Sequence, residues 1–337
     1  MKASISNYML NKKLKLNEHL FDPSPEQAPT RDGYGKALVE LGAQNPNIVV
    51  LTADLSESTR CEDFAKKFPR NFFDLGVAEQ NMVAVASGMA AAGKIAFVSS
   101  YATFSPGKNW ETIRTTIIYN QANVKIAGHH SGIVTGPDGA THQATEDIAI
   151  TRCWPDVQVI VPCDSIEAEK ATIYAAKTAG PVYLRFTRDK TPVITTAETP
   201  YNPNKISVFW ESAKPQVVIF GTGHILYNAL CAAHELEKEG LETLVANVSN
   251  IKPIDEATII ELVKITGAIV SVEDHQITGG LGGAIAEVLA RNFPVPQEFI
   301  GLQNTFAESG SSKELMKKYF MDKDSIKTAV KKVISRK

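Results

Sequence analysis

The sequence lacks the features that mark several large classes of protein. Its four cysteines are scattered and form no Cys-x-x-Cys pair, which argues against a structural zinc site or a disulfide framework. No apolar run reaches the roughly 18 residues of a membrane-spanning helix. No signal peptide is recognisable either. The net charge of −2 gives no basic field for nucleic acid. We therefore expect a cytoplasmic protein without membrane or nucleic-acid partners.

Nucleotide-binding motifs are missing as well. The glycines of residues 221–223 and 279–283 do not complete G-x-G-x-x-G, and no Walker motif occurs. Such glycines allow a helix to start close to its neighbours. The sequence therefore shows no phosphate cradle of its own for a nucleotide.

Short apolar runs alternate with segments of helical spacing along most of the 337 residues. The runs predict strands at 48–51, 72–75, 95–98, 124–128, 157–161, 182–186, 216–220, 243–247 and 268–272. The helical spacing predicts helices at 37–42, 81–93, 110–118, 165–178, 224–238, 256–264, 279–290 and 313–320. This alternation indicates an α/β fold of two domains, each a mostly parallel sheet flanked by helices.

Two segments do not follow the alternation. Residues 191–205 are rich in proline and threonine, so we predict a linker between a first domain at 30–190 and a second at 206–337. Residues 1–29 form an N-terminal extension, which is either a loosely ordered tail or an arm that packs on a partner subunit.

One acidic residue stands where α/β proteins place their ligands. Glu79 follows the short strand predicted at 72–75, which we expect to be buried, and lies in the first turn of the helix that continues through 81–93. An acid there is also favoured by the helix dipole alone, so its position does not by itself establish a function.

A second concentration of reactive side chains lies in the Gly-rich loop of residues 131–145. Three of the seven histidines fall between 129 and 142, and Asp138 lies among them. The side chains of this loop have three possible roles: they bind a metal, they form hydrogen bonds to a polyhydroxylated substrate, or they are simply solvated. No carboxylate or cysteine stands at a familiar zinc spacing.

Together, these segments closely resemble one family, the transketolases. The Gly-Val-Ala-Glu-Gln-Asn of 76–81 is similar to its cofactor-activating motif, and the Asp-Gly-Ala-Thr-His-Gln of 138–143 to its substrate loop. Residues 52–55, 187–188, 272–275 and 278–283 match in order and spacing as well. The resemblance runs from about residue 30 to the C-terminus, and it implies dependence on thiamine diphosphate.

The sequence resembles only the pyrimidine-binding and C-terminal domains of that family. The Gly-Asp-Gly motif, through which a preceding domain binds Mg²⁺ and the cofactor's diphosphate, is missing. We expect one subunit of a split transketolase, with the Mg²⁺ ligands on a separate N-terminal subunit and no metal ligands on this chain. A fragment of a full-length enzyme is the alternative, which the distinct extension at 1–29 disfavours.

The resemblance also implies roles for individual residues. Glu79 would donate a hydrogen bond to N1′ of the aminopyrimidine, which requires a protonated carboxyl group, favoured by desolvation and a neighbouring acid. The candidate catalytic residues are Glu79, His130 and His142. The candidate cofactor-binding residues are Glu79, Tyr101, Phe104 and Asp54, with Trp110 the weakest choice. The candidate substrate-binding residues are Asp138, Arg31, Ser58, Arg188, His130 and His142. The simpler explanation for Tyr101 and Phe104 is that they pack in the core, and the simpler explanation for each arginine is that it is a surface charge.

The expected activity is the transfer of a two-carbon ketol unit between ketose and aldose phosphates of the pentose phosphate pathway. The family resemblance implies an α2β2 heterotetramer, in which the C-terminal domain extends the interface and carries no catalytic residue. The small residues of helix 82–93 suit either a twofold interface or a tightly packed internal helix. Alternatives are the β subunit of a 2-oxo acid dehydrogenase, an enzyme like deoxyxylulose phosphate synthase, and a non-catalytic scaffold subunit.

Overall fold

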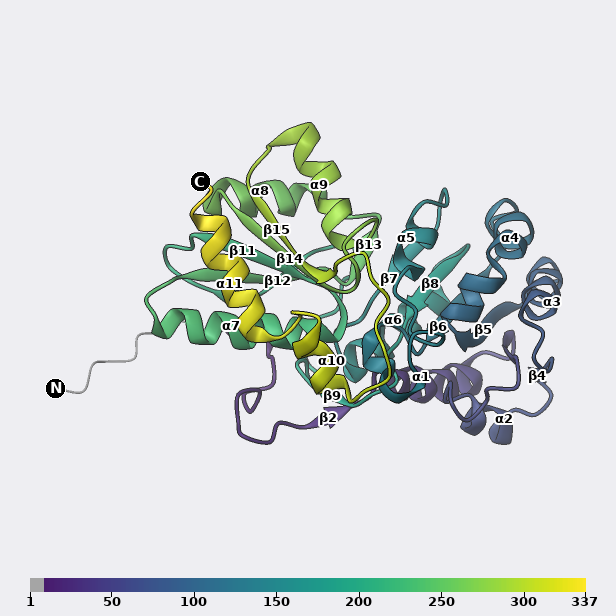
Figure 1. Cartoon of the computed structure of the whole chain (residues 1–337). Coiled ribbons are helices and arrows are strands. Elements are labelled where there is room, and N and C mark those ends of the chain that lie inside the picture. The colour runs from purple at the N-terminus through teal and green to yellow at the C-terminus, as the bar shows by residue number, and fades with distance from the viewer. Residues whose placement is uncertain (1–8) are drawn as a thin grey trace.

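Two sheets of mostly parallel strands form the centres of two domains that lie side by side (Figure 1). The structure is a computed structural model and describes residues 9–337. The predicted α/β class with two helix-flanked sheets is confirmed. None of the helices in residues 9–337 is long and apolar enough to cross a membrane.

The first domain is built on a seven-stranded sheet of order β13-β7-β8-β6-β5-β3-β4. Its strands are β3 (Ile48–Thr52), β4 (Phe72–Asp74), β5 (Ile95–Tyr101), β6 (Val124–His129), β7 (Gln158–Ile160), β8 (Val182–Arg185) and β13 (Asn250–Lys252). All pairs are parallel except that of β13, which belongs to the second half of the chain and pairs antiparallel with β7. The helices are α1 (Thr30–Gln44), α2 (Glu62–Lys67), α3 (Glu79–Ala91), α4 (Trp110–Thr112), α5 (Asp147–Arg152) and α6 (Ser165–Lys177).

The second domain has a six-stranded sheet of order β1-β10-β12-β11-β14-β15. Its strands are β1 (Met9–Leu10), β10 (Ser207–Glu211), β11 (Val217–Gly221), β12 (Thr243–Asn247), β14 (Ile269–Gln276) and β15 (Gln297–Leu302). Its helices are α7 (Leu226–Lys238), α8 (Glu256–Thr266), α9 (Leu281–Asn292), α10 (Ser312–Lys318) and α11 (Lys323–Ile334). The four strands from β12 to β15 in this order pair parallel, and β1 and β10 add an antiparallel edge.

Shorter elements complete the backbone. A small sheet pairs β2 (Gln27–Ala28) with β9 (Thr191–Pro192), so the predicted linker at 191–205 begins inside a strand pair. Turns of 3-10 helix span Lys12–Leu14, Ile133–Asp138 and Gly223–Ile225, and wider π-helical turns span Thr103–Lys108 and Ile113–Ile118.

Apolar side chains cover both faces of both sheets. One hydrophobic core packs under α3 in the first domain and continues under α8 and α9 in the second, with Met82, Ile259 and Ile285 all fully buried. The opposite face of the first sheet packs on α1 and α6, and the opposite face of the second sheet on α7 and α11. The shared core means that the two domains are packed against each other and not merely tethered.

The described part of the N-terminal extension is not a loosely ordered tail. Residues 9–29 run along the second domain of the same chain, where β1 pairs with β10 and Leu16 and Leu20 enter the core. The part of the extension before residue 9 lies outside the described residues.

Two other expectations need correction. The strand at 72–74 is only half-buried, because β4 is the edge of its sheet. The loop at 131–145 is not irregular throughout, since it contains the 3-10 helix Ile133–Asp138.

Candidate active site

The predicted site residues lie at or just beyond the carboxyl ends of neighbouring parallel strands. Tyr101 ends β5 and pairs with His129 at the end of β6, and His130 follows directly. Glu79 is the first residue of α3, which follows β4. Parallel strands bring their carboxyl ends to one edge of the sheet, which is where ligands of open α/β sheets bind.

Glu79 is held by residues of the turn that follows β5. Its side chain is 2% exposed, and Lys108 Nζ donates to its Oε2 at 2.9 Å, although Lys108 itself is 46% exposed. Asn109 Nδ2 donates to the backbone oxygen of Glu79 at 3.1 Å. Within the described residues, the group next to the carboxylate is therefore a lysine, whereas an acid was expected there.

Aromatic rings gather at the same edge of the sheet. The rings of Tyr101 and His130 stack with their centroids 3.7 Å apart and their planes 22° apart. Phe104 lies parallel to Tyr101 at 5.9 Å, and His142 meets Phe104 edge-on at 5.5 Å. The structure therefore brings together four predicted residues in one aromatic cluster, which we define as Tyr101, Phe104, His130 and His142.

His130 is a neutral ring in a strained backbone position. Burial, followed by the positive charges of Arg31 and Arg188, lowers its pKa to about 3. Its φ of +54° is uncommon for a residue with a side chain, and its buried Nδ1 has no partner among the described residues. Strain and an unpaired buried nitrogen together fit a residue that meets a ligand.

Three arginines stand near the cluster. Burial and the charges of Arg60 and Arg188 lower the pKa of Arg31, which donates through Nη1 to the backbone oxygen of Ser58 at 2.7 Å. Arg188 Nε lies 4.0 Å from Asp138 Oδ2. Asp32 pairs with Arg60 at 2.7 Å and raises the pKa of Arg31, but burial and the two neighbouring arginines outweigh it, so the arrangement suits a phosphate or another anionic group.

The remaining predicted residues are placed less tightly. Asp54 is exposed, with a φ of +62°, and its backbone N–H donates to Asp74 Oδ1 at 2.9 Å. Ser58 reaches Arg31 only through its backbone oxygen. Trp110 stacks on Trp154 and donates to the oxygen of Ile150, so it belongs to the packing of α5 and not to the aromatic cluster.

Comparison with known proteins agrees with this geometry. Residues 26–193 match the transketolase pyrimidine binding domain, and residues 209–326 match the transketolase C-terminal domain. The chain belongs to the transketolase family. It is 42% identical over 304 residues to the putative transketolase C-terminal section of Methanocaldococcus jannaschii, covering 88% of this chain and 93% of that one.

Solved structures and full-length relatives define which part of a transketolase this is. A split gene transketolase, solved as an inactive beta4 tetramer, superposes with a TM-score of 0.84 at 41% identity, covering 92% of this chain and 99% of that chain. Transketolase-like protein 2 of Mus musculus is 38% identical, and the chain spans 49% of its length. The chain therefore corresponds to the C-terminal section of a transketolase.

The residues present fit the aminopyrimidine of thiamine diphosphate, the cofactor that the family implies. A buried carboxyl group and nearly parallel aromatic rings are groups that such a ring can pair with and pack against. Residues 9–337 contain no cluster of three or more histidine, cysteine or acidic side chains that could hold a metal ion.

Sequence reasoning missed several neighbours of the site. Lys108, Asn109 and Arg60 contact or face predicted residues but belong to no motif considered above. Only their closeness in sequence to Phe104 and Ser58 could have pointed to them, because the contacts of Lys108 and Asn109 are formed by the tertiary fold.

Proposed function

We propose that this chain is the C-terminal subunit of a split transketolase, which transfers a two-carbon ketol unit between ketose and aldose phosphates. The observation that carries this proposal is the nearly complete burial of Glu79 at the carboxyl edge of the sheet, the same edge at which the aromatic cluster lies. Thiamine diphosphate, when bound, supplies the nucleophilic carbon for such a transfer.

The chain's own residues then have separate tasks. Glu79 donates a hydrogen bond to N1′ of the pyrimidine, and Tyr101 and Phe104 pack on that ring. Asp54 is a further contact of the cofactor. His130 and His142 bind the hydroxyl and carbonyl oxygens near the reacting carbons. Burial keeps His130 uncharged, so that it can accept or donate a hydrogen bond according to its tautomer. Asp138 binds the C2 hydroxyl of the sugar.

The far end of the substrate carries an anion. Arg31 and Arg188, with Ser58, bind this group, whose charge offsets the repulsion between the arginines. A phosphate is our first choice, which would place the reaction in the pentose phosphate pathway. Two relatives of 34% identity are a 6-deoxy-6-sulfo-D-fructose transketolase subunit from Clostridium sp. and an apulose-4-phosphate transketolase subunit from Phocaeicola vulgatus. A sulfonate is therefore the second candidate for the anionic end.

A partner subunit completes the enzyme in this proposal. An N-terminal subunit supplies the Mg²⁺ ligands and holds the diphosphate, and two copies of each chain form an α2β2 heterotetramer. Within the described residues, Ala84 and Gly88 on the outer side of α3 are exposed, and nothing lies within 4 Å of a Cβ built on Gly88. Such a surface allows close approach of another helix. The cytoplasmic location stays a prediction.

The test is reconstitution with the candidate N-terminal subunit, thiamine diphosphate and Mg²⁺. We expect ketol transfer from xylulose 5-phosphate to ribose 5-phosphate, and a loss of about 10³-fold or more in kcat for Glu79→Gln because the cofactor is no longer activated. A donor panel with 6-deoxy-6-sulfofructose and apulose 4-phosphate identifies the anion and the sugar. Circular dichroism checks that the variant is folded.

The alternatives give different results in the same assay. Decarboxylation of pyruvate with no ketol transfer would instead indicate a 2-oxo acid dehydrogenase β subunit, and condensation of pyruvate with glyceraldehyde 3-phosphate a deoxyxylulose phosphate synthase. Full activity of the chain without a partner would contradict the split enzyme, and full activity of Glu79→Gln would contradict its role.

A further inference from the structure

The loop of residues 131–145 contains the motif at 138–143 and is called the substrate loop from here on. Its backbone is held by a carboxylate from the other domain. Asp274 lies near the carboxyl end of β14, and its side chain is 1% exposed. Its Oδ1 accepts from the backbone N–H of Ile133 at 2.9 Å, and its Oδ2 lies 3.4 Å from that of Val134. His224 Nε2 lies 3.0 Å from the same Oδ2, so a second side chain also fixes the position of the carboxylate.

The approach of the two domains is close at this point. Gly132 has a φ of +78°, and a Cβ built on it would lie 2.0 Å from Asp274 Oδ2. Only glycine therefore fits between the loop and the carboxylate. The two N–H groups that face Asp274 belong to Ile133 and Val134, the first residues of the 3-10 helix Ile133–Asp138. Asp138 is the last residue of this helix.

Other contacts fix the rest of the substrate loop to the second domain. Gln276 N–H donates to the backbone oxygen of Thr145 at 2.8 Å, Ser312 Oγ donates to that of Val134 at 3.2 Å, and Gln143 Nε2 donates to that of Glu308 at 3.0 Å. The loop is therefore held near its beginning and near its end by residues of the second domain, which was expected to contribute no catalytic residue.

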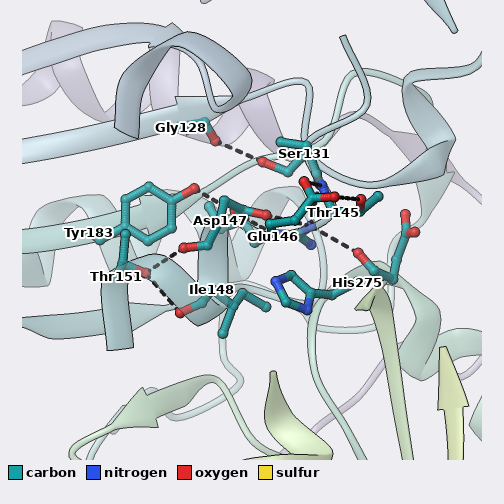
Figure 2. A network of polar contacts seen from close by, with 12 residues as sticks. Gly128, Ser131, Thr145, Glu146, Asp147, Ile148, Thr151, Tyr183 and His275 are labelled. Atoms are coloured by element: carbon teal, nitrogen blue, oxygen red, sulfur yellow. Dashed lines mark hydrogen bonds and ion pairs between the residues drawn. The ribbon is translucent and has the colours of Figure 1, made fainter. Parts of the chain in front are cut away.

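A buried ion pair fixes the other side of Asp274. Arg185 donates to the backbone oxygen of Asp274 at 2.9 Å and to that of Ala144 at 3.2 Å, and it pairs with Asp147 at 2.7 Å. Figure 2 shows Tyr183 pointing at Asp147, with Ser131 and Thr145 of the loop on one side and His275 of β14 on the other. The network joins β8, α5, both ends of the loop and β14.

Asp274 is a carboxylate in this setting. Burial works against its charge, but the hydrogen bond and charge of His224, the charge of Arg185 and the N–H of Ile133 outweigh it, so the pKa of Asp274 is lowered. Hydrogen bonds from N–H groups to a carboxylate are stronger than those to a neutral oxygen. Replacement by a neutral amide of the same size should therefore loosen the loop while keeping the packing.

We propose that Asp274 is a positioning residue for the transfer reaction, which fixes the substrate loop so that Asp138 meets the C2 hydroxyl of the sugar. This inference rests on the proposed function. Asp274 is aimed at the loop backbone and acts through it. A displacement of about 1 Å in a substrate-binding group can cost about 10²-fold in rate.

The test compares Asp274→Asn with Glu273→Gln in the enzyme reconstituted with its partner subunit. Glu273 is the matched control, because it is the neighbouring residue, equally buried, and accepts from the N–H groups of Leu281 and Gly282 at the start of α9 instead of from the loop. The readout is the ratio of kcat/KM for ribose 5-phosphate to that for 2-deoxyribose 5-phosphate, which lacks the C2 hydroxyl.

We expect Asp274→Asn to reduce this ratio about tenfold or more and to leave half-saturation by thiamine diphosphate unchanged, while Glu273→Gln keeps the wild-type ratio. A purely structural role would lower both rates in proportion, so an unchanged ratio overturns the proposal. Absence of ketol transfer in the wild type would be a failure of the proposed function instead.

A second measurement does not depend on activity. Amide hydrogen exchange in the peptide containing Ile133 and Val134 should become about tenfold faster in Asp274→Asn and stay unchanged in Glu273→Gln. Equal exchange in both variants overturns the proposal, whatever the wild type catalyses. If Asp274→Asn does not fold, Gly132→Ala separates the loop from the intact carboxylate, and it should cause the same loss of discrimination and faster exchange.

Discussion

The ion pair between Glu79 and Lys108 places a cation against the group that the proposed mechanism needs as a hydrogen-bond donor. A carboxylate facing an ammonium group at 2.9 Å accepts hydrogen bonds and cannot donate one. In the isolated chain, the pair also offsets the cost of burying the Glu79 charge. Binding of the cofactor would therefore have to displace Lys108, whose side chain is 46% exposed and free to move toward solvent.

This competition predicts a specific effect of Lys108→Met. Because half-exposed ion pairs contribute about 0.5–1 kcal/mol, the variant should bind thiamine diphosphate about 2- to 5-fold more tightly in the reconstituted enzyme. Titration calorimetry measures the dissociation constant. Lys66→Met, which removes a lysine paired with Glu62 on α2, is the control and should change nothing. Weaker cofactor binding in Lys108→Met would mean that this lysine is part of the cofactor site.

At the scale of elements, the N-terminal segment is a structural part of the second domain. Leu20 is fully buried among residues of α7 and β10, and the ring of Phe21 lies 4.5 Å from that of His234 and 5.9 Å from that of Trp210. The N–H of Asn17 donates to the oxygen of Ile194, which connects the segment to the predicted linker. These contacts cover apolar side chains of the sheet edge that would otherwise be exposed.

The segment should therefore contribute to folding stability. Leu20→Ala removes a buried side chain and leaves a cavity, so we expect a loss of about 2–5 kcal/mol in the free energy of unfolding, measured by urea denaturation. Glu18→Ala, two residues earlier and exposed, is the control and should change stability by less than about 0.5 kcal/mol. Equal effects of the two variants would show that the segment does not pack on the core.

The sequence was informative about elements whose environment is uniform. The strands at 48–52, 95–101 and 217–221 are central and parallel, so they read as continuous apolar runs. The missed strands β10 and β15 carry polar residues at their ends and are only partly buried. The missed helix α11 has Ile326, Val330 and Val333 at helical spacing, a signal that could have been read.

The same reasoning explains what could be known of the candidate site. Glu79, Tyr101, His130 and Asp138 follow predicted strands or lie in recognisable motifs, so a common edge of the sheet could be expected for them. The contact of Lys108 with Glu79 spans 29 residues of chain, and that of Asp274 with Ile133 spans 141. No local pattern encodes such contacts, since they depend on how the turns and the two domains pack together.

At the scale of the whole molecule, the two domains are joined by buried polar groups as well as by the shared core. Glu167 of α6 accepts from the backbone N–H of Cys163 at 2.6 Å and from Asn247 Nδ2 of β12, in the other domain, at 2.8 Å. The side chain is buried in this junction, and burial, with the nearby charge of Asp164, raises the pKa of Glu167 to about 7 against the hydrogen bonds that favour its charge.

This raised pKa makes the junction sensitive to pH. In the unfolded chain, Glu167 releases its proton near pH 4.5, whereas the folded chain keeps it up to about pH 7. The folded state therefore binds more protons than the unfolded state in this range. The stability that the Glu167 proton contributes is fully present below about pH 4.5 and is lost as the pH rises to about 7. Since one pKa unit corresponds to about 1.4 kcal/mol, the expected loss is about 3 kcal/mol.

Glu167→Gln should remove this pH dependence, because the amide oxygen can still accept from the N–H of Cys163 and no proton is released. We expect the free energy of unfolding of the wild type to fall relative to that of Glu167→Gln between pH 4.5 and pH 7, by urea denaturation at both values. Glu169→Gln, on the same helix and paired with Lys36, is the control and should follow the wild type. Parallel curves for the wild type and Glu167→Gln would show that the buried carboxyl group at the domain junction does not hold its proton.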